Sequence, residues 1–161
     1  MNNFDWTSFT KRIAIKAALT DIYKAWTVPV ELERWFLERV VFHSQDGALV
    51  QSAESGAEYD WYWYLDTNPL KGKMLTANGK DFLQFTFEGN SLVAVSLSTL
   101  DEYVIVELRH YNIPEDEHSK QYIRLGCSSG WAFYLHNLKS VYEGGIDLRN
   151  KDPKLGVMIN N

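Results

Sequence analysis

The alternation of hydrophobic and polar residues changes period along the chain. Between residues 40 and 111, apolar side chains recur at every second position, which is typical of strands with one buried face. A shorter run of the same kind comes earlier, where Phe9, Ile13 and Ile15 lie among polar neighbours. The pattern predicts strands over residues 8–16, 40–44, 57–64, 70–77, 81–87, 92–97 and 102–111.

Turn residues separate these strands. Asp46-Gly47 and Asn78-Gly79 are the strongest turn signals, because Asn, Asp and Gly tolerate the positive φ that tight hairpins require. The segment 88–90 reads Glu-Gly-Asn and joins two further strands. Closely spaced strands with short turns indicate an antiparallel meander.

Helical periods flank the meander. Thr20 and Asp21 offer capping groups before a short helix over residues 22–26. Pro29 opens a second short helix that runs to Phe36, because a proline in the first turn loses no needed donor.

The longest helical pattern covers residues 119–143 and would span about 37 Å. One apolar stripe runs along it, and Gly144-Gly145 is a stop signal. The stripe contains Ile123, Cys127, Trp131, Tyr134, Leu135, Leu138 and Tyr142.

The order of these elements predicts an α+β fold in one domain, residues 1–161, since no linker, repeat or low-complexity tract divides the chain. A strand comes first, then two short helices, the remaining strands and the long helix. The apolar face of the sheet must be covered, and the long helix is the only element large enough to cover it.

Composition narrows the class of partner. The formal charge of −5 argues against nucleic acid and against anionic membrane surfaces, both of which favour Lys and Arg stripes. The single cysteine fits a reducing compartment. The opening residues lack a signal-peptide pattern, and no apolar run approaches the roughly 18 residues of a membrane span. We therefore expect a cytoplasmic protein.

Several segments, taken in order, resemble one protein family. Residues 13–17, 22–27 and 32–36 are similar to the first strand and the two short helices of the Hsp90-ATPase-activator-like branch of the START/Bet v 1 helix-grip superfamily. Residues 106–110 resemble its last strand, and residues 130–139 and 143–145 its long helix. The resemblance implies a curved antiparallel sheet of six or seven strands wrapped around the C-terminal helix, with an internal pocket between them.

The chain departs from the family pattern in two places. Ser55-Gly56-Ala57 stands where Gly-Gly is common, and the cluster 61–64 is heavier in aromatic rings. The resemblance also implies a chaperone partner. The eukaryotic co-chaperone has a further domain before this one, for which 161 residues leave no room, so we rank a chaperone below a small molecule.

The aromatic content is six Trp, nine Tyr and eight Phe, and rings of this kind either fill a core or wall a cavity. For any single ring, core packing is a better explanation than ligand contact. Taken together, so many rings favour a cavity, because the polar tips of Tyr and Trp require partners when they are buried. The residues expected to line it are Trp35, Tyr59, Trp61, Trp63, Phe85, Phe87, His110, Trp131, Tyr134 and Leu138.

Other chemistry has weaker support. His110 shares a strand face with Leu108 and should point to the helix, where a hydrogen-bonded core histidine is the better interpretation. Glu58 and Asp60 have the opposite parity to the Trp row, so we expect them on the solvent side. The four histidines lack metal-ligand spacing, and no phosphate loop or strained nucleophile turn is present. We expect no metal and no cofactor.

The sequence thus predicts a non-enzymatic protein that binds an apolar or aromatic small molecule between sheet and helix. One alternative is a polyketide cyclase-like enzyme that uses the same cavity. Another is a chaperone-linked interaction module with Trp6, Tyr62 and Tyr64 as exposed anchors. No pattern specifies an oligomeric state.

Overall fold

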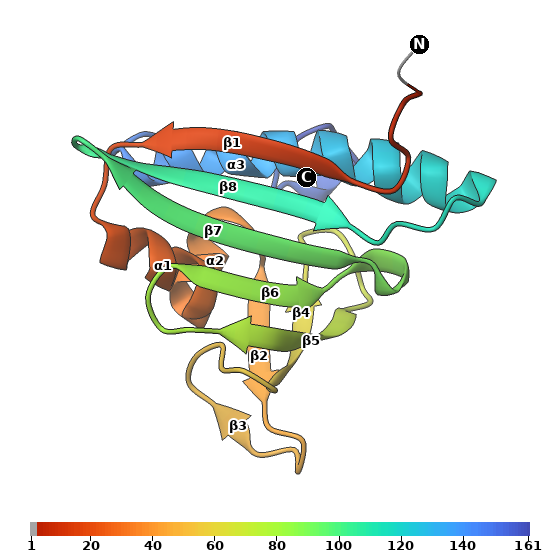
Figure 1. Ribbon diagram of the computed structural model, residues 1–161. Helices are drawn as coiled ribbons and strands as arrows, with labels where there is room; N and C mark the ends of the chain where they lie inside the picture. Colours follow the sequence, from red (N-terminus) through yellow and green to blue (C-terminus); the bar gives the residue numbers. More distant parts are fainter. Residues whose placement is uncertain (1–2) are drawn as a thin grey trace.

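The computed structural model describes residues 3–161 and shows one curved antiparallel sheet with a long helix across it (Figure 1). Its eight strands lie in the order β1-β8-β7-β6-β5-β4-β2-β3. Their bounds are β1 Phe9–Ile15, β2 Arg39–His43, β3 Leu49–Val50, β4 Glu58–Tyr62, β5 Leu70–Ala77, β6 Phe82–Thr86, β7 Leu92–Leu100 and β8 Tyr103–Tyr111. The predicted helix-grip fold is confirmed.

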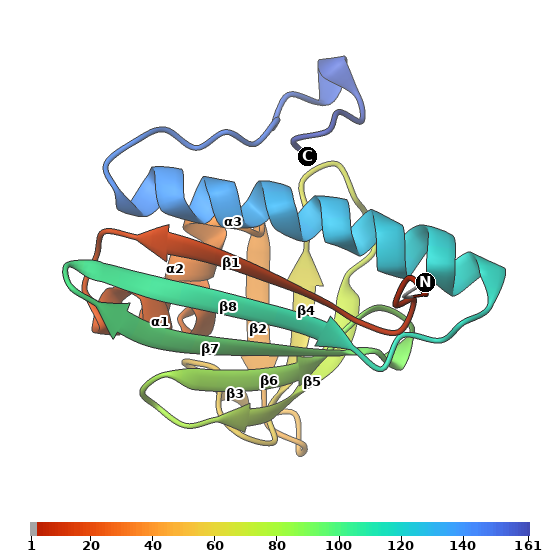
Figure 2. The same cartoon turned by 45° about the horizontal axis from the view of Figure 1, so that its top comes forward.

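Helices α1 (Leu19–Thr27) and α2 (Pro29–Trp35) connect β1 to β2, as the sequence predicts. The long helix begins as a π-helix, η2 (Ser119–Cys127), and continues as α3 (Ser128–Tyr142). Two short 3₁₀ turns, η1 (Glu88–Asn90) and η3 (Pro153–Leu155), complete the elements. Figure 2 shows α3 extending along the sheet beside β1.

The core lies between the concave face of the sheet and the long helix. Alternate residues of β7 and β8, such as Val95 and Val106, are fully buried. Trp131, Leu135 and Leu138 of α3 are buried in the same hydrophobic cluster. The predicted helical stripe therefore faces the sheet, because it carries the apolar surface that the strands must cover.

Two features differ from the predicted elements. Strand β3 pairs with β2 through only two residues, too few to give a period in the sequence. The first part of the long helix is π-helical over nine residues, although its apolar spacing reads as an ordinary α-helix.

The segment after the long helix, where the sequence pattern predicts no element, returns along α3 (Figure 2). The buried Asn137 amide holds it: Nδ2 donates to the Trp35 carbonyl over 2.8 Å, and Oδ1 accepts from the Leu148 amide over 2.8 Å. One α3 side chain thus links the end of α2 to the C-terminal segment.

Nothing in the described part of the chain is a candidate for crossing a bilayer, because none of its helices is both long and apolar enough.

Candidate ligand-binding pocket

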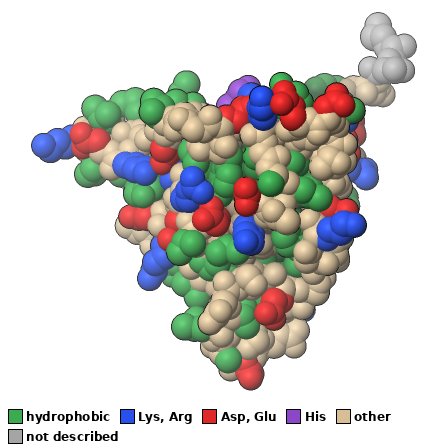
Figure 3. Space-filling model, turned by 90° about the vertical axis from the view of Figure 1, so that its left-hand side faces the viewer, with side chains coloured by type: hydrophobic (Ala, Val, Ile, Leu, Met, Phe, Trp, Pro, Cys, Tyr) green, Lys and Arg blue, Asp and Glu red, His purple; other side chains and the backbone are tan. Residues whose placement is uncertain are grey.

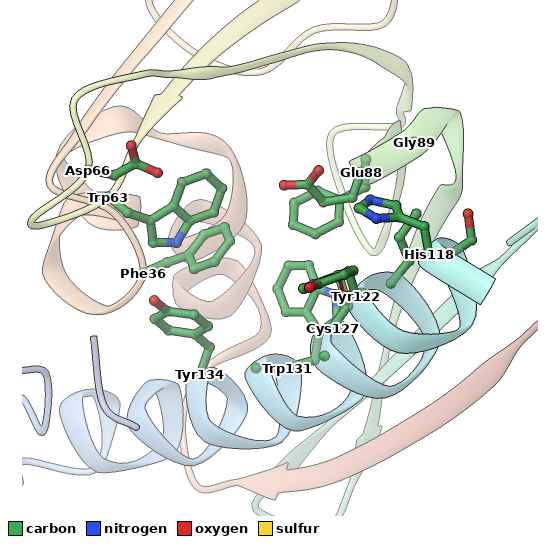
Figure 4. Close-up of a pocket in the computed structure, with 15 residues that line it drawn as sticks. Phe36, Trp63, Asp66, Glu88, Gly89, His118, Tyr122, Cys127, Trp131 and Tyr134 are labelled. Atoms are coloured by element: carbon green, nitrogen blue, oxygen red, sulfur yellow. Dashed lines mark hydrogen bonds between the residues drawn. The ribbon is translucent and has the colours of Figure 1, made fainter. Parts of the chain in front are cut away.

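A pocket of about 580 Å³ opens between the long helix and the loops at one end of the sheet (Figure 4). Its walls come from the end of α2, the segment after β4, the connection from β6 to η1, and the helix η2–α3. The lining residues are Phe36, Trp63, Asp66, Phe87, Glu88, Gly89, His118, Ser119, Tyr122, Ile123, Gly126, Cys127, Gly130, Trp131 and Tyr134.

Aromatic rings form the inner wall. The Phe36 ring lies 5.2 Å from the Trp131 ring, 4.9 Å from Tyr134 and 5.5 Å from Trp63, between centroids. Phe87 lies 5.2 Å from Trp131 on the other side. These edge-to-face and tilted contacts fix the rings against one another, so the wall is preformed.

The helix contributes lining residues as neighbouring pairs at every fourth position, from 118–119 to 130–131, and ends with 134. An α-helix has 3.6 residues per turn, so a step of four residues covers slightly more than one turn. A row of residues spaced by four therefore moves gradually around an α-helix. The π-helix η2 has more than four residues per turn, so the same spacing covers slightly less than one turn there. The two displacements have opposite directions, and the lining residues of η2 and α3 stay on one face of the long helix. The unexpected π-helix is therefore part of the pocket wall.

Two glycines leave room on this face. A methyl group added at Gly130 would meet no atom of another part of the protein within 4 Å. Gly126 would meet only the Gln121 carbonyl oxygen, at 3.5 Å. A methyl group at either position would therefore fit without displacing the pocket walls.

The polar groups on the pocket do not form a nucleophile paired with a base. Burial, and then the negative charge of Glu88, raise the pKa of the Cys127 thiol to about 12. Burial chiefly raises the pKa of Tyr134 to about 12 as well. Both groups stay protonated at neutral pH, so neither is an activated nucleophile.

The structure brings four of the ten expected site residues to the pocket. They are Trp63, Phe87, Trp131 and Tyr134. Trp63 directly follows β4, and Phe87 directly follows β6. The pocket therefore lies past the ends of these strands, at one edge of the predicted aromatic rows.

The other six expected residues do not line this pocket and pack in the core: Trp35, Tyr59, Trp61, Phe85, His110 and Leu138. The Trp35 indole donates to the Ala25 carbonyl over 2.9 Å, and Tyr59 stacks on Trp61 with 4.0 Å between ring centroids. The Tyr59 hydroxyl donates to the Thr86 carbonyl, whereas the buried Trp61 indole nitrogen has no hydrogen-bond partner within the described chain. These rings are packed against one another and fill the middle of the sheet.

His110 is fully buried, and its Nε2 lies 2.6 Å from the Ser91 hydroxyl oxygen. A core histidine bonded to a neighbouring side chain is thus what the structure contains, with serine as its partner. Burial, and then the positive charge of Arg124, lower the pKa of His110 to about 4.

The sequence prediction did not include several pocket residues. Asp66 lies in a loop and Glu88 begins the 3₁₀ turn η1, and no period marks either position. Phe36 was expected only as the end of the second short helix. A usable signal was the pair Gly126 and Gly130 on one face of a long helix, because small residues leave space there.

The carboxylates Glu58 and Asp60 belong to a charge group on the outer face of the sheet. The His43 ring nitrogens lie 3.6 Å from Glu58 and 3.7 Å from Asp60, and Lys71 lies 3.7 Å from Asp60. No cluster of His, Cys, Asp or Glu within residues 3–161 is arranged to hold a metal ion.

The rings suggested as exposed anchors are half-buried and lie under cations. The Arg39 guanidinium lies 3.9 Å from the Tyr62 ring centroid, and Arg149 lies 5.3 Å from that of Tyr64. The face in Figure 3 shows acidic and basic side chains interspersed among hydrophobic ones. These rings therefore already contact cations of the same chain, which leaves less of each ring free to contact a partner protein.

Comparison with known proteins agrees with this architecture. The family model described as activator of Hsp90 ATPase homolog 1-like protein matches residues 16–143. The chain belongs to this family. The matched residues include α1, α2, all strands after β1, and the long helix. No curated protein sequence matches the chain.

Solved structures similar to this member of the activator of Hsp90 ATPase homolog 1-like family share its fold. The solution structure of the Aha1 dimer from Colwellia psychrerythraea has 21% identity and a TM-score of 0.68, covering 86% of this chain and 97% of that one. The protein SSP2350 from Staphylococcus saprophyticus has 13% identity and a TM-score of 0.71, covering 88% and 96%. CalU16 from Micromonospora echinospora has 20% identity and a TM-score of 0.65, covering 88% and 77%.

Proposed function

We propose that this protein is a cytoplasmic binding protein that holds an apolar or aromatic small molecule in the pocket without acting on it chemically. The observation that carries the proposal is a 580 Å³ pocket with six aromatic side chains in its lining. Pockets for drug-sized ligands typically measure about 300–1,000 Å³ and are walled mainly by such side chains. The single cysteine supports a reducing compartment.

An enzyme of the polyketide cyclase type would use the same cavity but has less support. It requires an ionisable group that faces open space at a useful pKa. His110 was one candidate, and it does not line the pocket. A buried Tyr or Glu was the other: Tyr134 lines the pocket but, like the Cys127 thiol, stays protonated at neutral pH, and Glu88 is exposed. A chaperone partner is supported by the family description alone.

A neutral fluorescent probe tests the proposal. N-phenylnaphthylamine becomes brighter in apolar surroundings, and we expect it to bind with one site per chain. The variant Gly130→Leu would place a side chain in open pocket volume and should weaken probe binding at least about tenfold.

Ser129→Leu is the matched control, because Ser129 is the exposed neighbour of Gly130 on the same helix and does not line the pocket. It adds a comparable apolar side chain outside the site. Equal probe binding by both variants would contradict the proposal, as would the absence of binding to the unmodified protein.

A further inference from the structure

The charged groups around the pocket are all of one sign apart from a single histidine. Asp66 and Glu88 contribute carboxylates, His118 contributes an imidazole, and no Lys or Arg among residues 3–161 lines the pocket. Figure 4 shows the Asp66 and Glu88 carboxylates on opposite sides of the pocket, with the aromatic rings between and below them. The entrance therefore carries negative charge.

Neither carboxylate is neutralised by the described part of the chain. Asp66 accepts a hydrogen bond from the backbone N–H of Asn68 over 3.1 Å. No ion pair within residues 3–161 involves Asp66 or Glu88. Their charge is thus available to a ligand. The raised pKa of Cys127, to which the charge of Glu88 contributes after burial, indicates that this field reaches into the pocket.

The aromatic wall of the pocket also favours a cation. The faces of Trp, Tyr and Phe rings carry partial negative charge and attract cations, most strongly where water is excluded. Phe36, Trp63, Phe87, Trp131 and Tyr134 all line the pocket, and Trp131 and Phe36 are almost completely buried. The aromatic rings and the two carboxylates therefore line the same pocket.

We infer that the pocket takes an organic cation, with a protonated or quaternary amine on an apolar or aromatic body. This inference rests on the proposed function and specifies the ligand class for it. An anionic ligand would meet two carboxylates and no fixed positive charge. His118 does not supply such a charge to the inner wall, because its ring packs at the rim on Tyr122, 4.6 Å between centroids.

Three probes with one apolar body test the inference: naphthylmethyl-trimethylammonium, naphthylmethanol and naphthylmethanesulfonate. Calorimetric titration in about 0.15 M salt limits long-range attraction by the net negative charge. We expect the ammonium probe to bind about tenfold more tightly than the alcohol, and the sulfonate to bind most weakly.

Glu88→Gln and Asp66→Asn should each weaken ammonium binding about threefold to tenfold and leave naphthylmethanol binding unchanged. Both residues are exposed, so neither change disturbs the core. Glu54→Gln is the matched control, because it changes the net charge equally at an exposed position between β3 and β4, outside this pocket.

The outcomes separate the two proposals. Equal or tighter binding of the alcohol or the sulfonate would overturn the cation inference and leave the pocket proposal standing, as would an effect of Glu54→Gln as large as that of Glu88→Gln. If no naphthyl probe binds and Gly130→Leu does not change N-phenylnaphthylamine fluorescence, the pocket proposal fails as well.

Discussion

The buried Ser91 hydroxyl joins His110 to the rim of the pocket. Its oxygen lies 2.6 Å from Nε2 of His110, and its hydrogen is donated to the Glu88 carbonyl over 2.6 Å. Because a hydroxyl has one hydrogen, Ser91 must accept from Nε2–H, which defines the neutral tautomer of His110. Nδ1 then has no hydrogen-bond partner within the described chain.

This arrangement predicts a pH-dependent stability. Protonation would place a charge and an unpaired donor in the core, consistent with the lowering of the His110 pKa from 6.5 to about 4. Between these values the unfolded chain binds more protons, so stability is fully present above pH 6.5 and falls as the pH drops towards 4. We expect His110 to contribute a loss of about 2 kcal/mol in the free energy of unfolding from pH 7 to pH 5.

Urea denaturation of the unmodified protein and of His110→Gln at both pH values measures this contribution. The variant should lose less stability than the unmodified protein over the same interval. His136→Gln is the control, because His136 is exposed on α3. Parallel profiles for the unmodified protein and His110→Gln would show that His110 is not the titrating group.

The position of His110 illustrates what the sequence could predict. Along β8, Val104, Val106, Leu108 and His110 alternate with less buried residues, and this period alone indicates that the histidine faces the core. Its partner Ser91 lies between η1 and β7, and no pattern in the sequence indicates that the two side chains meet. Periods therefore predict which face a residue occupies, but not its contacts across the sheet.

Trp131 is the second test, because the fold depends on its placement between helix and sheet. Its side chain is 2% exposed, and its ring lies 5.2 Å from both Phe36 and Phe87. Trp131→Ala should lower the free energy of unfolding by about 3–5 kcal/mol, as for a large buried aromatic. Tyr122→Ala, at an exposed ring on the same helix, should cost less than about 1 kcal/mol. Near-unchanged stability of Trp131→Ala in urea denaturation would contradict the packing.

Two glycine substitutions should change stability in opposite directions. At Gly72, an added methyl group would lie 2.3 Å from the ring of Tyr59, which is buried and donates to the Thr86 carbonyl over 2.5 Å. Gly72→Ala should therefore cost about 1–3 kcal/mol through overpacking. Gly130→Ala has space in the helix and should add up to about 1 kcal/mol. Thermal unfolding compares the two, and a neutral Gly72→Ala would mean that Tyr59 can move away.

The parts of the molecule that the sequence did not predict lack regular periods. Trp63 and Phe87 continue the apolar alternation of β4 and β6, so their strand positions did not separate them from the packed rings. Asp66 and Glu88 depend on how two loops approach the helix, which only the folded chain determines. The segment after Gly145 shows no regular alternation of apolar and polar residues. Hydrogen bonds, such as those of Asn137, hold it to the rest of the fold instead of an apolar stripe.

Arg149 provides the test of that segment. Its side chain is 1% exposed, and it donates to the carbonyls of Leu37 over 3.0 Å and Glu33 over 2.8 Å while pairing with Asp147 at 2.8 Å. Removing the guanidinium would leave unpaired carbonyls at the end of α2 and a carboxylate with fewer partners. We expect Arg149→Met to lower the free energy of unfolding by about 2–4 kcal/mol in urea denaturation.

Lys151→Met is the matched control, because Lys151 also pairs with Asp147, at 2.7 Å, but its side chain is 44% exposed. An exposed pair of this kind contributes about 0–1 kcal/mol. Arg149→Lys should recover only part of the loss, because an ammonium group cannot reproduce the planar set of donors that reaches three partners. If Arg149→Met and Lys151→Met are equally stable, the C-terminal segment does not hold α2 in place, and its hydrogen bonds add little to the fold.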